Sequence, residues 1–316
     1  MLKPIFAALT LTLATSAQAE VFMVDLTHPI PTFKPMDGDP MKPDMNQPWL
    51  DSQPIPTFGQ QTVLSISEFP TNQGHFDLGL LVLSEHHGTH MDTSAHYVND
   101  PSSMEEGGIP PEQRRLAHQL GAEDLIGPAV LIDISGRVHS ELDKNGGKPS
   151  PDTQVTDFGE DTPNVVTADD IAAVAEHLDN GVWLVLNTGW SDFFFQGIDF
   201  AKDPYVNGWN HPGLSHAAVD KLIEIENEKG IKIRGIVADN IGIESGESGK
   251  GEDDKWTNAF YGHVRGLQRG WQFVENATNL GQLAMANPGS CTLIVGAPKH
   301  VRGTGGPSRV LAMCEK

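Results

Sequence analysis

The sequence predicts an α/β fold with a mixed sheet in a single domain. Short apolar runs of strand length alternate along the chain with amphipathic segments of helix length. The predicted strands follow one another at both short and long spacings, so both antiparallel and parallel neighbours are expected. The 316 residues are enough to bury a sizeable core, and no repeat, linker or long charge run divides them.

Five apolar runs have the length and composition of strands. They occupy residues 21–26, 78–83, 128–134, 182–187 and 235–239, and two further runs, 291–295 and 309–314, close the chain. Residues 31–57 are instead rich in proline and polar residues. We expect them to form a long excursion, of the kind that often serves as a binding loop or lid.

Two segments carry helix signals at their ends. Thr167 is followed three residues later by Asp170, which is a capping-box start. Ser215 and Gly230 enclose an amphipathic stretch as its N-cap and C-cap residues. We therefore expect helices over residues 167–178 and 215–229, and irregular followed by helical structure over 98–120.

Residues 1–19 have the features of a secretory signal peptide. Lys3 precedes an apolar run over residues 5–14, and Ala17 and Ala19 are the small residues that a signal peptidase reads. A membrane anchor is the alternative, but the run is well short of the roughly 20 residues that span a bilayer. We expect cleavage after Ala19, a domain over residues 20–316, and a periplasmic or secreted protein without membrane contact after cleavage.

The charge of the chain excludes some classes of partner. The formal net charge is −21, and no basic patch is apparent. Binding to nucleic acid or to an anionic membrane needs such patches. We therefore expect no nucleic-acid partner, and the acidity by itself does not indicate the substrate.

The chain has two cysteines, Cys291 and Cys314, and they lie in the two closing apolar runs. If these runs pair as antiparallel strands with opposing residue numbers summing to 605, the two cysteines lie opposite each other. Cα atoms at such positions are about 4.5 Å apart when they do not exchange hydrogen bonds, which is close enough for a disulfide. Two buried free thiols are the alternative, and the sequence does not decide between them.

The densest group of chemically active residues lies in residues 85–96, which contain four histidines and an aspartate. Imidazole nitrogens and carboxylate oxygens are the usual ligands of Zn²⁺ and Mn²⁺. In an extended chain His90 and Asp92 project to the same side, and a turn at Gly88 can bring His86 to the same point. A carboxylate can also bridge two cations, so the group fits one metal ion or half of a two-metal site.

The other two histidines of the group are His87 and His96. A turn after Asp92 would bring His96 to the same face, whereas His87 points away from His86 and is not expected to bind metal. The alternative for the whole group is a polar loop whose histidines cap helices and bind water. Further ligands would come from a distant segment, where His263 and Glu275 are candidates, although each alone is more often a structural residue.

The pattern His-x-Gly-Thr-His-x-Asp-x-x-x-His over residues 86–96 resembles the signature of the cyclase family, whose members include bacterial kynurenine formamidases and isatin hydrolases. Residues 24–30, 187–191, 211–215 and 296–309 are similar to other family segments, and His263 and Glu275 have the spacing of its second ligand pair. Ser94 stands where the family usually has proline. The resemblance covers nearly the whole mature chain.

The resemblance implies the swivelling β/β/α architecture of this family, usually as a homodimer, with zinc or manganese in one or both of two sites. It also implies roles for six residues. His86 and His90 would bind the first metal, Asp92 would bridge, His263 would bind the second metal with help from Glu275, and His96 would donate and accept protons.

The expected reaction is hydrolysis of a linear formamide or of a cyclic amide of the lactam or oxindole type. A divalent metal lowers the pKa of bound water from about 15.7 to about 7, so hydroxide can attack the carbonyl. A histidine can then carry a proton to the leaving nitrogen. Export argues against tryptophan catabolism, which is cytoplasmic, and favours a cyclic amide, lactam or lactone met outside the cell.

Two alternatives remain open at this stage. One is a non-catalytic periplasmic protein that binds metal or a small ligand on the same scaffold. The other is a lactonase, dehydratase or cyclase that uses the same metal as a Lewis acid. Thr89 and Asp239 are candidates to orient metal ligands, although a turn hydroxyl and a strand-end carboxylate explain them equally well.

Overall fold

The computed structural model describes residues 19–48, 62–68, 77–96, 108–144, 146–149, 158, 162–194, 203–246 and 260–316. Nearly all of the expected signal peptide, residues 1–18, lies outside this range, as do residues 49–57 of the expected excursion. In the part of the chain that is described, no helix is long and apolar enough to cross a membrane.

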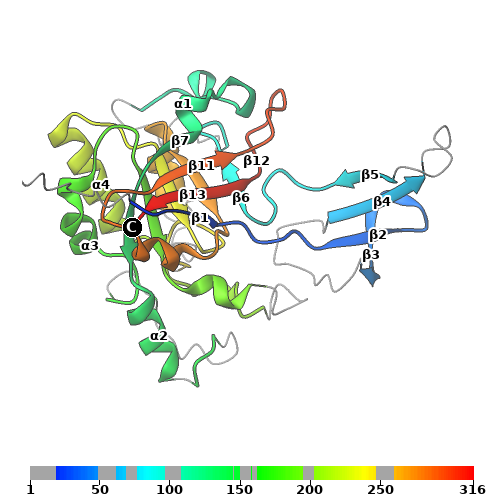
Figure 1. Cartoon of the computed structure of the whole chain (residues 1–316), viewed down its shortest axis with the longest axis horizontal. Coiled ribbons are helices and arrows are strands. Elements are labelled where there is room, and N and C mark those ends of the chain that lie inside the picture. The colour runs from blue at the N-terminus through cyan, green and yellow to red at the C-terminus, as the bar shows by residue number, and fades with distance from the viewer. Residues whose placement is uncertain are drawn as a thin grey trace, which may run out of the picture.

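A nine-stranded mixed sheet forms the centre of the molecule, with strand order β1-β13-β11-β7-β8-β9-β10-β6-β12 (Figure 1). Strands β7, β8, β9 and β10 run parallel, and the strands outside them pair antiparallel. The mixed sheet predicted from the strand spacing is therefore confirmed. In sheet order the strands are Val21–Asp25, Arg309–Glu315, Thr292–Gly296, Ile126–Asp133, Trp183–Asn187, Gly235–Ala238, Gln272–Glu275, His90–Asp92 and Gly305–Pro307.

Both faces of the central strands are buried. In β8, Leu184 and Leu186 pack into the core on the side of helices α3 (Ala168–Ala173) and α4 (His216–Lys229), whereas Trp183 and Val185 pack on the opposite side. The second core also contains Val24 of β1 and Leu293 of β11. The sheet therefore curls, so that its antiparallel end covers the face of the parallel strands that these helices leave open.

The helices confirm the predicted caps. Helix α4, His216–Lys229, begins after Ser215, whose hydroxyl accepts a hydrogen bond from the Ala218 backbone, and ends at Gly230 with φ of 63°. Helix α3, Ala168–Ala173, begins with the capping box of Thr167 and Asp170. The other described α-helices are α1 (Ala122–Leu125), α2 (Ser135–Asp143) and α6 (Tyr261–Gln268).

The expectation of one helix over 167–178 was wrong at its C-terminal end. Helix α3 stops at Ala173, and the chain continues as a 3₁₀ turn over Ala175–His177. This turn buries Leu178 completely, and Lys229 donates hydrogen bonds to the carbonyls of Ala175 and Leu178. Tertiary contacts therefore replace the last helical turn. Between residues 108 and 120 the predicted helical structure is limited to 3₁₀ turns at Pro111–Gln113 and Ala117–Gln119.

Residues 32–48 are not the irregular excursion that their composition suggested. They form strands β2 (Thr32–Met36) and β3 (Asp39–Pro48), which join β4 (Thr62–Glu68) and β5 (Asp77–Val82) in a second sheet of order β3-β2-β4-β5. The prolines misled the prediction because β3 is an edge strand, and its pairing with β2 is irregular; both settings tolerate proline.

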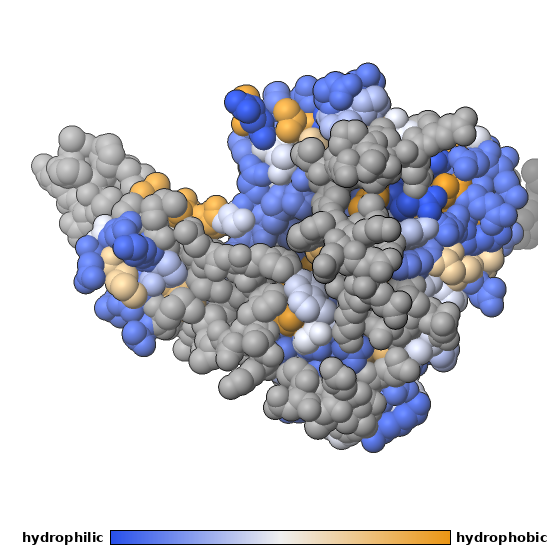
Figure 2. Space-filling model, turned by 180° about the vertical axis from the view of Figure 1, so that it is seen from behind, coloured by the Kyte–Doolittle hydropathy of each residue, from blue (hydrophilic) through white to orange (hydrophobic). Residues whose placement is uncertain are grey.

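The second sheet extends away from the main body as an arm (Figure 1). Leu80 and Leu81 of β5 are exposed there. In Figure 2 the arm lies at the left and carries hydrophobic surface, whereas much of the coloured surface of the body is hydrophilic. Strand β5 leads back from the arm into the histidine-rich segment, as the apolar run at 78–83 predicted.

The two closing strands settle the alternatives for the cysteines. Strands β11 and β13 pair antiparallel with Thr292 opposite Met313 and Leu293 opposite Ala312, which is the register whose residue numbers sum to 605. Cys291 and Cys314 form a disulfide with their Cα atoms 4.1 Å apart. The disulfide is therefore confirmed and the free-thiol alternative is wrong.

Candidate metal centre

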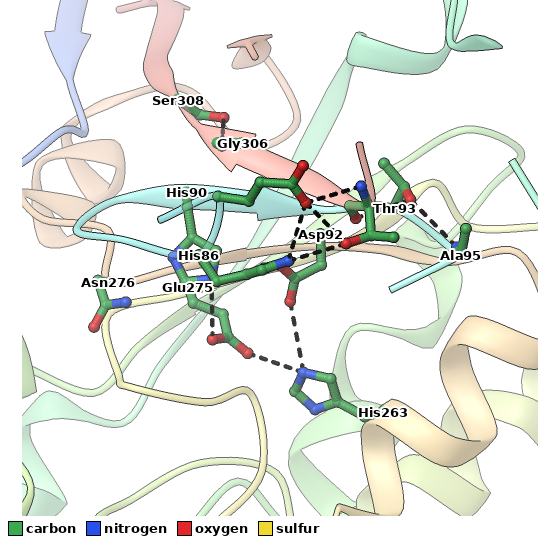
Figure 3. A network of polar contacts seen from close by, with 12 residues as sticks. His86, His90, Asp92, Thr93, Ala95, His263, Glu275, Asn276, Gly306 and Ser308 are labelled. Atoms are coloured by element: carbon green, nitrogen blue, oxygen red, sulfur yellow. Dashed lines mark hydrogen bonds and ion pairs between the residues drawn. The ribbon is translucent and has the colours of Figure 1, made fainter. Parts of the chain in front are cut away.

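Strand pairing places the predicted ligands of β6 and β10 side by side. His90 and Asp92 lie two residues apart in β6 and project to one side, as expected for an extended chain. Strand β10 pairs antiparallel with β6 and sets Glu275 directly opposite His90. His263 comes from the first turn of α6. Figure 3 shows Asp92 and Glu275 both directed toward the His263 ring.

Two groups of side chains offer closely spaced ligand atoms, and they share Asp92. One group is His86, Asp92 and His96, and the other is His90, Asp92 and Glu275; within each group the ligand atoms lie within 4.8 Å of one another. His263 Nε2 extends the second group, at 3.2 Å from Glu275 Oε1 and 3.6 Å from Asp92 Oδ2. The arrangement can hold two cations bridged by one carboxylate.

Two of the histidines are fixed through Nδ1. His90 Nδ1 donates to the Gly88 carbonyl oxygen at 2.9 Å, and His263 Nδ1 donates to the Glu244 carboxylate at 2.8 Å. A ring nitrogen that donates leaves the other nitrogen free of hydrogen in the neutral ring. In both residues this leaves Nε2 directed at the carboxylates as a potential ligand.

The carboxylates fit a cation, because two of their buried oxygens face only an imidazole nitrogen within the described chain. Asp92 Oδ2 and Glu275 Oε1 lie 3.6 and 3.2 Å from Nε2 of His263, without the geometry of a hydrogen bond. Burial and the neighbouring Asp92 raise the pKa of Glu275. Burial opposes ionisation of Asp92 too, but the surrounding histidines outweigh it and hold the pKa of Asp92 well below its usual range. Two buried carboxyl groups in contact with imidazoles form a donor set suited to Zn²⁺ or Mn²⁺.

Comparison with known proteins places this geometry in a family. Residues 24–245 match the sequence profile of the Cyclase family, described as "Putative cyclase". The chain belongs to the Cyclase family. This match covers more than half of the chain and includes the whole of the histidine-rich segment.

Relatives of this cyclase-family chain agree with the assignment. It is 27% identical over 271 residues to the isatin hydrolase of Roseibium aggregatum, covering 83% of this chain and 85% of that protein. The fold is similar to an isatin hydrolase bound to the product analogue thioisatinate (TM-score 0.59, 24% identity, 94% of each chain). It is also similar to isatin hydrolase A from Ralstonia solanacearum (TM-score 0.60, 20% identity, 93% of this chain and 92% of that one).

All six residues singled out in the sequence come together in this family fold. The His86 and His96 rings are in contact, with centroids 3.8 Å apart and planes tilted by 33°, so His96 lies close enough to His86 and Asp92 to act as a ligand as well as a proton carrier. Burial lowers the pKa of His96 to about 4, below the near-neutral value assumed for a proton carrier, so its ring is neutral at pH 7. Ser94 accepts a hydrogen bond from the Arg115 backbone and does not displace His96.

His87 belongs to neither group and is completely buried, in keeping with its exclusion from the ligand set.

The two residues that were candidates to orient metal ligands, Thr89 and Asp239, have different surroundings. Thr89 donates to the Asn276 carbonyl and accepts from the His28 backbone, so it joins the ligand strand to β10 and β1. Asp239 accepts hydrogen bonds from Thr188 and Trp190, which form a turn, and these bonds tie it to that turn rather than to a ligand.

The sequence reasoning missed Glu244 and Asn276. Glu244 is buried and accepts hydrogen bonds from both Nδ1 and the backbone nitrogen of His263. Asn276 donates from Nδ2 to the Gly88 carbonyl, the same oxygen that receives His90 Nδ1. A carboxylate or amide behind a ligating histidine fixes its ring and raises its basicity. Neither residue lies near its histidine in the sequence, so no local pattern marked it.

Proposed function

We propose that this protein is a metal-dependent hydrolase of amide bonds, acting on a cyclic amide of the lactam or oxindole type or on a linear formamide. The observation that carries the proposal is the sharing of Asp92 between two groups of ligand atoms, together with two buried carboxylate oxygens, Asp92 Oδ2 and Glu275 Oε1, that both face Nε2 of His263. Similarity to isatin hydrolase supports the cyclic amide. Amide hydrolysis needs both an activated water and a polarised carbonyl, and a two-cation site serves both needs.

The proposed ligands are His86, His90, Asp92, His263 and Glu275, with zinc or manganese in one or two positions. A bound divalent cation supplies positive charge that acidifies water and polarises the substrate carbonyl. The contribution of the protein is a fixed anionic bridge, Asp92, buried where water cannot screen its charge.

His96 is the proposed proton carrier. Its ring lies beside the proposed ligands His86 and Asp92, where an imidazole can accept a proton from water and pass it to the leaving nitrogen. The ring contact with His86 keeps the His96 ring beside the proposed ligands. Amine departure depends on this proton, because an amide anion is a very poor leaving group.

We also propose a periplasmic or secreted location and a homodimer of single swivelling β/β/α domains spanning residues 20–316. The Cys291–Cys314 disulfide supports the location, because disulfides persist mainly in oxidising compartments. The expected partners are a small-molecule amide substrate and a second copy of the chain, without nucleic acid.

Metal analysis followed by turnover tests this function. The purified protein is analysed for bound metal, reloaded with Zn²⁺ or Mn²⁺, and given isatin, an aromatic formamide, a simple lactam, a lactone and an ester. Metal-dependent hydrolysis of an amide supports the proposal, with product mass separating hydrolysis from dehydration. Turnover of the lactone alone would make the protein a lactonase, and no turnover of any substrate by the loaded protein would leave a binding protein.

A further inference from the structure

Thr304 lies in contact with the proposed metal strand although it precedes a different strand, β12. Its carbonyl oxygen accepts hydrogen bonds from the backbone nitrogen and hydroxyl of Thr93, at 2.8 and 2.9 Å. The next residue, Gly305, is paired with Asp92 in the sheet. The loop before β12 is therefore bound directly to the segment that carries the proposed ligands.

Glycines on both sides of Thr304 allow this close approach. A Cβ atom at Gly305 would collide with the His86 ring and the Met91 carbonyl, and one at Gly303 would collide with the His300 ring. With no Cβ, the loop can lie flat against both imidazoles. The Thr304 hydroxyl reaches His86 from this position, with Oγ1 3.3 Å from Nε2.

Glu85 fixes the direction of the Thr304 hydroxyl. Its Oε2 accepts from the backbone nitrogen of Thr304 at 3.1 Å and from the hydroxyl at 3.0 Å, while Oε1 lies 2.6 Å from Nε2 of His300. A hydroxyl has one hydrogen, and a carboxylate can only accept. The Thr304 hydrogen therefore goes to Glu85, and its oxygen lone pairs are left to accept from His86.

This direction decides the tautomer of His86. If Thr304 accepts, then His86 Nε2 carries a hydrogen, and Nδ1 is the nitrogen that a cation would take. Nδ1 lies 2.6 Å from Asp92 Oδ1, so without a cation it donates to this carboxylate, and a cation bound here would replace that hydrogen. His90 and His263 are held the other way, with Nδ1 donating and Nε2 directed at the site.

We propose that Glu85 and Thr304 are positioning residues that hold His86 with hydrogen on Nε2, so that it binds metal through Nδ1. The inference rests on the proposed metal-dependent function. Without Glu85, the hydroxyl of Thr304 can rotate and donate to Nε2, which favours the opposite tautomer and removes the ligand atom beside Asp92.

Four variants test the proposal by metal binding rather than turnover. Thr304→Val removes the hydroxyl at constant shape, Thr304→Ser keeps it, and Glu85→Gln supplies an amide that can donate to Oγ1. Thr27→Val is the matched control, because the Thr27 hydroxyl bonds the backbone of Val310 in β13 and, among the described residues, makes no hydrogen bond to a proposed ligand. Zinc affinity is measured by competition with a chelator, and the tautomer by ¹⁵N NMR of histidine ring nitrogens, with the His86 signals assigned by their loss in His86→Asn.

Thr304→Val and Glu85→Gln should weaken binding of one zinc ion by about 10–100-fold, the usual effect of losing a group behind a ligand. Thr304→Ser and Thr27→Val should bind zinc as the wild type does, and loaded wild type should show hydrogen on His86 Nε2. Should Thr304→Val fail to fold, Glu85→Gln and Thr304→Ser still carry the comparison.

Unchanged zinc affinity in Glu85→Gln, or hydrogen on His86 Nδ1 in the loaded wild type, would overturn the inference. These outcomes are separate from failure of the proposed function. A wild type that binds zinc, shows the expected tautomer and hydrolyses no substrate refutes the hydrolase and leaves the positioning role intact. A wild type that hydrolyses amides, with zinc affinity indifferent to Glu85, refutes only the positioning role.

Discussion

His90 lies directly opposite Glu275 in the antiparallel pairing of β6 and β10, and its Nε2 atom is 3.6 Å from Glu275 Oε2. The two residues are 185 positions apart in the sequence, yet the register of two short strands brings them together. Both side chains are buried, so bulk water does not compete for their contacts. This pair is therefore the most direct place to test whether the group binds metal.

Replacement of His90 by alanine should abolish binding of at least one metal ion, because it removes an imidazole whose Nε2 faces both carboxylates. The measurement is the metal-to-protein ratio by mass spectrometry after reloading. His87→Ala is the control, since His87 is equally buried but lies outside both ligand groups, and it should keep its metal. Unchanged metal content in His90→Ala would refute the ligand assignment.

His96→Ala should retain metal and lose activity by about 100- to 10,000-fold, the usual range for loss of an acid–base group. Metal content and kcat are measured on the same preparation. Because His96 lies close to His86, the experiment also tests whether His96 is itself a metal ligand. Loss of metal would make His96 a ligand, and retention of activity would remove it from the mechanism.

Glu244→Gln should weaken metal binding by about 10–100-fold, because the His263 ring loses the carboxylate that orients it. Glu226→Gln is a suitable control. Glu226 is also a buried carboxylate, but it accepts from Arg269 and Trp271 away from the site. The Glu226→Gln substitution should lower the unfolding midpoint and leave metal affinity unchanged. Equal metal affinity in the two variants would argue against a role for Glu244 in orienting His263.

Removal of the disulfide by Cys291→Ala with Cys314→Ala should lower the free energy of unfolding by about 3 kcal/mol, as expected for a closed loop of this length. The two cysteines are 23 residues apart. Denaturant unfolding of the metal-free protein measures the change. Metal content should stay the same, since the disulfide joins β11 and β13 rather than the ligand strands. Equal stability of the variant and the oxidised wild type would contradict the prediction.

Asp239 should make stability depend on pH. Burial raises the pKa of Asp239 to about 6, well above the value of about 3.9 expected in the unfolded chain. The folded state then holds the proton more tightly, so this contribution to stability is complete below pH 4 and is lost as the pH rises to 6. The measurement is the unfolding free energy of metal-free wild type and Asp239→Asn. The unfolding free energy of the wild type minus that of Asp239→Asn should fall between pH 4 and 6 and stay constant above pH 6. A difference that does not depend on pH would refute the prediction.

Much of the fold could be predicted because its signals are local. Ser215 and Gly230 cap α4 through hydrogen bonds to residues within one turn. The two cysteines fixed a register because antiparallel pairing relates residue numbers by a constant sum. The second sheet was missed for the opposite reason, since the edge position of β3 and its irregular pairing with β2, not the composition, accommodate the prolines of these strands.

The candidate site likewise contains residues that the sequence indicated and residues that it did not. His86, His90, Asp92 and His96 lie within eleven consecutive residues, so spacing and alternation alone indicated one ligand cluster. The residues behind them could not be found by spacing. Glu244 reaches His263 across 19 residues, and Glu85 reaches Thr304 across 219.

The sequence by itself determined most strands of the main sheet, the caps of α3 and α4, the candidate ligand residues, and that His90 and Asp92 project to one side of an extended segment. Only the tertiary structure decided how those side chains are oriented. Orientation depends on hydrogen bonds in which Glu244 and Thr304 accept and Asn276 donates, and these exist only after the curled sheet has brought β10, α6 and β12 against β6. Candidate ligands can be found from their spacing in the chain. The tautomer and orientation of each histidine ring depend on residues that are close only in the folded structure.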